Sequence, residues 1–448
     1  MISGCGTTPV QQVPSSPPEG WEYASPTARD AWPARDWWRA FGSAELDQLM
    51  VDAQAGNPDL GAAAARVLQA EAQARIAGAS LLPNVDLGLD ASRSGLVEQG
   101  GASGSYSSSL GASYELDFWG ANRARRDGAR AALQATAFDR ETVAITLSAG
   151  VASAYLQVLS LQERLEIARL NLELAEEILR VVESRVSSGA GTPLDLARQR
   201  AVVARQRASV QPLLQQERDA RAALALLLGR VPQGFAVDGN LADILIPEVM
   251  AGLPAELLVR RPDIRQQEAR LLAADADIAV ARAAFLPGVR LTGAVGTRSD
   301  VFSEVFSGDL LYNIGASLTQ PIFNAGRLRA QRDLSEARKL ELLEFYRGAI
   351  QQAFAEVDLS LSDIETLSEQ AFQQEIELTQ TRRAFTLAEA RYREGADDLL
   401  TLLDAQQSLY QAEENNGLLR LAQMQAIVTL YRVLGGGWSD AAPRDDTE

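Results

Sequence analysis

The segment Asn57-Pro58-Asp59-Leu60 returns 204 residues later as Arg261-Pro262-Asp263-Ile264. Toward the C-terminus the spacing of equivalent residues becomes 206, as between Gly189 and Gly395. A solenoid repeat is only about 20–50 residues long, so each copy here is half of a protein. Neither half reads as a globule with its own core. We therefore expect one shared, pseudo-symmetric architecture with an internal two-fold repeat.

The composition narrows the functional class. Histidine is absent from the 448 residues, and Cys5 is the only cysteine. This removes the commonest general base, the commonest metal ligand and every cysteine-based zinc pattern. We expect no enzyme, no cofactor and no metal site, with catalysis by paired carboxylates or lysine as the alternative. The net charge of −17 argues against nucleic acid as a partner, because phosphates would not be neutralised.

The sequence has no unbroken run of 18 or more apolar residues, the length typical of a membrane-spanning helix. If the protein enters a membrane, we therefore expect it to do so through β-strands or through a covalently attached lipid. Ile2-Ser3-Gly4-Cys5 resembles the end of a bacterial lipobox, which predicts lipidation of Cys5 and a tether over residues 1–20. A chance cysteine in a tail is the alternative. Only four residues precede Cys5, so we expect the signal peptide to be incomplete here.

Two pairs of segments alternate between apolar and polar residues, the period of a β-strand. They cover residues 84–94 and 106–118 in the first copy and 288–297 and 310–322 in the second. A Gly/Ser-rich segment, residues 94–105, predicts a loop between the first two. Strands of about ten residues suit a tilted crossing of a bilayer, and a small polar face suits a water-filled lumen. A soluble hairpin with one face on a core is the alternative.

The rest of the chain predicts helices of unusual length. They cover about residues 121–187, 194–228, 326–394 and 399–434, with apolar residues at three- and four-residue spacing. The predicted organisation is a first repeat over 21–228, a connector over 229–256, a second repeat over 257–436 and a disordered tail over 437–448. A soluble coiled-coil protein is the alternative, but it leaves the strands between the helices unexplained.

The number of strands per chain limits how many chains can form a closed barrel. Four strands per chain cannot close a barrel, two chains would give a barrel of about eight strands filled by side chains, and three chains would give one wide enough for a pore. Geometry therefore favours a homotrimer.

Several motifs, taken in order, resemble outer-membrane efflux channels of the TolC type, in the lipoprotein branch typified by OprM and NodT. The motifs are Trp37-Trp38-Arg-Ala-Phe41, Tyr114-Glu-Leu-Asp-Phe-Trp-Gly120, Leu257-Leu-Val-Arg-Arg-Pro-Asp-Ile264, Leu318-Thr-Gln-Pro-Ile-Phe-Asn-Ala-Gly-Arg327 and Leu402-Leu-Asp-Ala-Gln406. The resemblance spans about residues 30–436.

The resemblance implies a mixed α/β membrane protein. Its trimer would form a twelve-stranded transmembrane β-barrel, four strands per chain, which continues into a long periplasmic α-helical barrel. Such channels are passive conduits for drugs and solvents in the outer membrane, and they work with a periplasmic adaptor (membrane fusion protein) and an inner-membrane pump of the resistance-nodulation-division type. Export of proteins by type I secretion, or of metal ions, is the alternative use of the same architecture.

The resemblance also implies functional residues. At the periplasmic end, Leu400 and Asp404 match apolar and acidic gate positions, and Tyr392 matches a tyrosine that latches helices. Three Asp404 carboxylates around one axis would repel each other and attract cations; a solvated helix residue is the alternative. At the spacing of 206, Arg198 takes the place of Asp404 in the first copy, so we expect the gate where the copies differ.

Two further sets of residues complete the expected sites. The turns predicted to dock the adaptor are Gly189 with Ala190 and Gly395 with Ala396, although these glycines also suit a helix C-cap. Glu115 and Asp117 are expected to face the lumen near the base of the barrel, with solvation of the rim as the alternative.

Overall fold

A computed structural model describes residues 18, 20–23, 32–95, 102–248, 251–252, 254–307 and 309–439. Cys5 and nearly all of its predicted tether lie outside the described residues, as do residues 440–448 of the predicted tail. Lipidation of Cys5 therefore stays a prediction.

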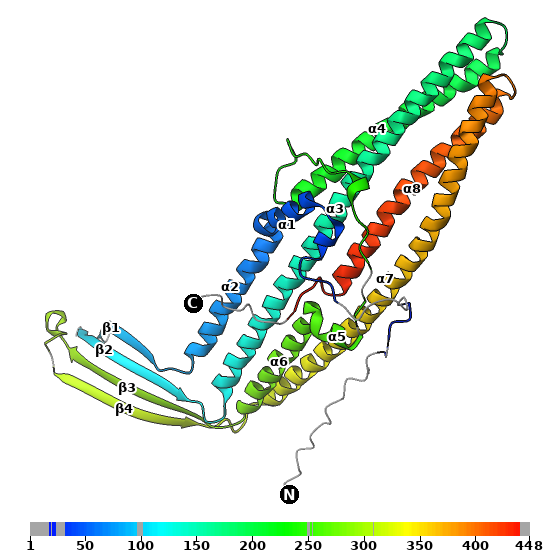
Figure 1. Cartoon of the computed structure of the whole chain (residues 1–448). Helices are drawn as coiled ribbons and strands as arrows, with labels where there is room; N and C mark the ends of the chain where they lie inside the picture. Colours follow the sequence, from blue (N-terminus) through cyan, green and yellow to red (C-terminus); the bar gives the residue numbers. More distant parts are fainter. Residues whose placement is uncertain are drawn as a thin grey trace, which may run out of the picture. The chain divides into compact units, whose positions relative to one another are not determined.

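The strands form one antiparallel sheet in the order β1-β2-β3-β4 (Figure 1). They are β1 (Asn84–Gly95), β2 (Ala102–Leu116), β3 (Gly288–Ser299) and β4 (Leu310–Thr319). Strand β2 begins inside the segment that its Gly/Ser content predicts to be a loop, because pairing with β1 outweighs weak strand propensity. Strand β4 ends before residues 320–322, where Pro321 has no N–H to donate to a ladder.

The register places most of the large apolar residues of the four strands on one face. Leu87 lies opposite Leu110, and Leu110 lies opposite Val295. Val295 in turn lies opposite Tyr312. Leu87 is 73% exposed and Tyr312 is 82% exposed in the single chain. The described residues of the chain therefore leave this apolar face uncovered.

The long helices begin and end within a few residues of the predicted positions. The helices are α1 (Ala44–Gly56), α2 (Pro58–Ala79), α3 (Ala121–Ser187), α4 (Pro193–Leu227), α5 (Pro254–Arg260), α6 (Pro262–Ala283), α7 (Arg327–Arg393) and α8 (Leu399–Val433). Short 3-10 turns lie at η1 (Trp37–Phe41), η2 (Leu241–Asp243) and η3 (Phe302–Glu304). α3 and α7 have 67 residues each, and α4 and α8 have 35 each, so the two copies match in length.

Side chains near the helix starts fix where these helices begin. The Asn57 side-chain oxygen accepts hydrogen bonds from the backbone N–H groups of Asp59 and Leu60, at 2.9 and 3.0 Å. Thr192 and Asp195 form a reciprocal capping box at the start of α4. Each satisfies N–H groups that have no partner within the helix.

Contacts divide the chain into two compact units, and each unit contains pieces of both copies of the repeat. The helical unit comprises residues 1–63, 140–262 and 349–448, and the sheet unit comprises residues 64–139 and 263–348. The two compact units therefore do not correspond to the two copies of the sequence repeat.

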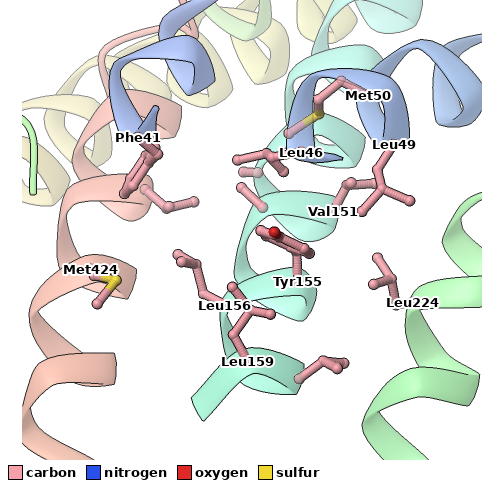
Figure 2. Close-up of a cluster of buried hydrophobic side chains, with 14 of the residues drawn as sticks. Phe41, Leu46, Leu49, Met50, Val151, Tyr155, Leu156, Leu159, Leu224 and Met424 are labelled. Carbon is pink, nitrogen blue, oxygen red and sulfur yellow. The ribbon is translucent and has the colours of Figure 1, made fainter. Parts of the chain in front are cut away.

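The core of the helical unit surrounds the middle of α3. Figure 2 shows Val151, Tyr155 and Leu156 of α3 between Met424 of α8 and Leu224 of α4. One stretch of α3 is apolar enough to cross a membrane by length and composition, and half of it is buried inside the protein. Counting unbroken apolar runs misses this stretch, because Ser, Thr and Gln interrupt the uncharged residues 142–162. Side chains of this stretch, Tyr155 and Leu156 among them, belong to the buried core.

Glu45, in the first turn of α1, holds the connector in place. Its carboxylate accepts hydrogen bonds from the backbone N–H groups of Asp238 (3.0 Å) and Gly239 (2.8 Å). The hydroxyl of Tyr155 donates to the same carboxylate at 3.0 Å. Burial raises the pKa of Tyr155 to about 12, with a smaller contribution from the charge of Glu45, so the hydroxyl remains a donor. A Cβ on Gly239 would lie 2.2 Å from this hydroxyl, which explains the glycine.

We predict that Glu45→Ala releases the connector. The change removes three hydrogen bonds to a charged acceptor, each worth about 1.5–3 kcal/mol. Limited proteolysis should cut residues 229–248 several-fold faster than in the wild type. Gln48→Ala on the same helix is the control, because Gln48 is exposed and its amide donates to Asp52 within the same helix. Equal cleavage of the Glu45→Ala and control proteins would contradict the role of Glu45.

Candidate functional site

A groove of about 720 Å³ lies in the helical unit near the tips of the long helices, with residues of α3, α4 and α8 around it. Two of the three predicted gate residues, Leu400 and Asp404, line it from α8. They lie one helical turn apart, and both are exposed. The structure therefore brings these two residues onto one face of α8.

The opposite side of the groove carries the counterpart of Asp404. Arg198 of α4 occupies the equivalent position in the first copy and lines the same groove. Its positive charge also contributes to a lowered pKa of Asp398, behind the larger effect of the hydrogen bonds from Thr401. The groove thus contains an acidic position from one copy and a basic position from the other.

Polar side chains of α3 and α8 that line the groove bind to one another. Gln406 is only 1% exposed, and its amide donates to the hydroxyl of Tyr410 at 2.6 Å. That hydroxyl donates to the backbone oxygen of Asn171 at 3.0 Å. Arg164 pairs with Glu414 beside them. These bonds tie α8 to α3 and fix the face that α8 presents.

Tyr392, the third predicted gate residue, lies elsewhere. It is 5% exposed and packs in a core with Ile178 and Val182 near the helix tips. The guanidinium of Arg185 lies 4.7 Å from the centre of its ring and donates to its backbone oxygen at 2.6 Å. Burial raises the pKa of Tyr392, and the charge of Arg185 partly opposes this. Tyr392 thus joins the ends of α3 and α7 and does not line the groove.

The two predicted docking turns have the same backbone geometry. Gly189 and Gly395 have φ values of 78° and 77°. The N–H of Ala190 donates to the backbone oxygen of Arg185, and Ala396 donates to Arg391 in the same way, both at 2.8 Å. This is the Schellman pattern that ends a helix with a left-handed residue. The geometry accounts for both glycines, and adaptor docking stays a prediction.

The ion pair and the helix cap at the second turn were not predicted from the sequence. Arg391 contacts both carboxylate oxygens of Asp397, at 2.6 and 3.0 Å, and this pairing lowers the pKa of Asp397. Asp398 accepts a hydrogen bond from the N–H of Thr401 and thereby caps α8. A pair separated by a turn has no helical spacing, so periodicity gives no signal for it. Charge reversal of either aspartate would disturb the turn itself.

The acidic residues expected in the lumen have nearby partners. Glu115 lies opposite Arg290 in the register of β2 and β3, on the polar face of the sheet. Asp117 follows the last residue of β2 and accepts hydrogen bonds from the N–H groups of Asn122 and Arg123. Burial acts to raise the pKa of Asp117, but these hydrogen bonds outweigh it and lower the value. Asp117 is therefore a cap of α3, and exposure of either carboxylate to a lumen stays a prediction.

We predict that the tip glycines tolerate asparagine better than alanine. Alanine at a left-handed position costs about 1–2 kcal/mol, whereas asparagine adopts this conformation more readily. Amide hydrogen exchange in residues 391–398 should therefore accelerate roughly 5- to 30-fold in Gly395→Ala and much less in Gly395→Asn. Ala396→Ser, outside the left-handed position, is the control. Equal exchange in the alanine and asparagine variants would exclude a capping role.

Known proteins resemble this chain over almost its whole length. The outer membrane efflux protein family matches residues 49–230 and 253–436, so the match itself follows the repeat. The pyoverdine export outer membrane protein OpmQ of Pseudomonas aeruginosa is 47% identical over 451 residues, covering 98% of this chain and 95% of that protein. OpmQ of Pseudomonas putida is 46% identical, with coverage of 99% and 96%. The toluene efflux pump outer membrane protein TtgF of Pseudomonas putida is 35% identical, with coverage of 98% and 95%.

Solved structures agree with the sequence matches. The outer-membrane channel OprN superposes with a TM-score of 0.87 at 30% identity, covering 97% of this chain and all of that one. The open state of the Neisseria gonorrhoeae MtrE outer membrane channel also gives 0.87 at 30% identity, with coverage of 96% and 97%. These matches confirm the predicted fold class. The chain belongs to the outer membrane efflux protein family and is an outer-membrane channel protein of the TolC type, not an enzyme.

Proposed function

We propose that three copies of this chain form one conduit that carries small molecules across the outer membrane. The observation that supports it best is the exposed apolar face of an open four-stranded sheet. In lipid, an open sheet edge is not tolerated, and an apolar outer face is required. Three such sheets joined edge to edge would satisfy both conditions.

The helix tips supply the partner surface in this proposal. The turns Gly189-Ala190 and Gly395-Ala396 end the two long hairpins and receive a periplasmic adaptor, which connects the channel to an inner-membrane pump. Several relatives are named as outer membrane proteins of efflux pumps, TtgF among them, and this supports a multi-component system. The channel itself is passive in this arrangement, so the pump selects the cargo.

We infer that the cargo is pyoverdine or a similar secreted molecule. The relatives named for pyoverdine export are 46–47% identical to this chain, whereas the relative named for toluene efflux is 35% identical over the same share of the chain. Solvents and antibiotics are the second candidate, supported by those more distant relatives. Protein and metal-ion export have less support from the names of these relatives.

We predict that this chain restores pyoverdine export in Pseudomonas aeruginosa without OpmQ. Pyoverdine in the medium should recover, and pyoverdine in the periplasm should fall. Toluene survival of Pseudomonas putida without TtgF tests the second candidate in parallel. Failure of both, with the protein present in the outer membrane, would refute the proposed cargo classes.

The gate in this proposal is the ring of Leu400 and Asp404 contributed by each chain. Three carboxylates at one narrow axis would repel one another and attract cations. The exposure of both residues on one face of α8 supports such a ring, while Tyr392 fixes the helix ends behind it.

We predict that Asp404→Ala increases single-channel conductance in planar bilayers and antibiotic leak in cells. Loss of the carboxylate removes the charge and the volume that narrow the axis. Glu377→Ala is the matched control, because it removes an exposed acidic side chain from α7 outside the groove. Unchanged conductance in Asp404→Ala would remove Asp404 from the gate.

A further inference from the structure

Two arginines of α4 line the groove without forming an ion pair among the described residues, although the charge of Arg198 is felt by Asp398. Arg198 and Arg205 are both exposed and both line the groove. They are seven positions apart, which places them about 10 Å apart along one side of the helix. Within the described part of the chain, neither side chain forms an ion pair or a hydrogen bond. Their guanidinium groups are therefore available to a ligand.

The neighbouring arginines of α4 are different. Arg200 pairs with Glu183 at 3.1 Å, and Arg207 pairs with Glu176 at 2.6 Å. Both pairs run between α4 and α3 and lie outside the groove lining. One side of α4 thus uses its arginines to hold the helix hairpin together. The groove side leaves the same kind of residue unpaired.

The charge in the groove is locally positive, although the chain as a whole carries −17. Five charged residues line it: Arg164, Arg198, Arg205, Asp404 and Glu414. Arg164 and Glu414 form an ion pair. This leaves two cations against one carboxylate, with Gln and Tyr side chains between them as hydrogen-bonding groups.

The groove also contains polar atoms whose hydrogen bonds are not met by the described residues. The side-chain oxygen of Gln406 and the Nε of Arg164 are buried and have no hydrogen-bond partner there. Gln406 itself is 99% buried. Buried polar atoms normally have partners. These two atoms are covered by neighbouring side chains, while the groove itself, at about 720 Å³, has the size of a small-molecule site.

We propose that this groove is a binding and transit site for small solutes that carry carboxylate groups, with Arg198 and Arg205 as successive contacts. A guanidinium binds a carboxylate through two parallel hydrogen bonds. Two such groups about 10 Å apart allow a solute to move from one to the next along α4. Asp404 beside them keeps each contact weak enough to release, as conduction requires. The inference rests on the proposed function, because only a conduit passes cargo along this face.

Citrate is the probe for a first experiment on the full-length protein in detergent. Isothermal titration should show citrate binding to the wild type at constant pH and ionic strength. The double variant Arg198→Gln/Arg205→Gln should weaken this binding at least tenfold. Arg200→Gln/Arg207→Gln is the matched control, because it removes the same charge from the same helix outside the groove. Its affinity should stay within twofold of the wild type.

A bilayer recording separates this inference from the proposed function. Citrate added at the helix-tip side should reduce the current of the wild type and of the control, and have little effect on the Arg198→Gln/Arg205→Gln channel. Equal loss of citrate binding in both double variants, or no binding in the wild type, would overturn the site even if the channel conducts. Citrate binding to a protein that does not conduct would keep the binding site and overturn both its transit role and the proposed conduit.

Discussion

Backbone hydrogen bonding at the edges of the sheet constrains the rest of this structure. In the described part of the chain, β1 and β4 each pair with one neighbouring strand. Each unpaired N–H or C=O group costs several kcal/mol in lipid. Strands from other molecules of this protein are therefore needed at the two edges. Every strand also connects directly to a helix in sequence: α2 leads to β1, β2 to α3, α6 to β3 and β4 to α7. When sheets of several chains join edge to edge, the helices attached to each sheet are therefore brought together as well.

The two copies of the repeat have the same helix lengths and helix ends, but they contribute different charged residues to the groove. Helix lengths and the hydrogen bonds that end α3 and α7 are the same in both copies. The groove is different, because α4 contributes Arg198 where α8 contributes Asp404. If the two copies were identical, both would carry a charge of the same sign at this position. Because they differ, the groove contains one positive and one negative side chain there.

Local signals in the sequence predicted most of the elements, while the contacts within the site needed the structure. Strand alternation and the tip glycines act over a few residues, so their positions are visible in the sequence. The bonds from Glu45 to residues 238–239 and the pair of Arg391 with Asp397 follow no period. The burial of Tyr392 against Arg185 likewise depends on residues 207 positions apart. Propensity alone also placed the start of β2 too late, since pairing extended it.

The core around α3 has a consequence for how the protein folds. It unites Phe41 and Met50 near the beginning of the chain with Met424 and Tyr431 near its end. Such contacts span almost the entire sequence, and a high contact order slows folding. The core cannot close until α8 is available, so the chain remains without its main stabilising contacts during synthesis. Completion of this core therefore waits for the last helix of the chain.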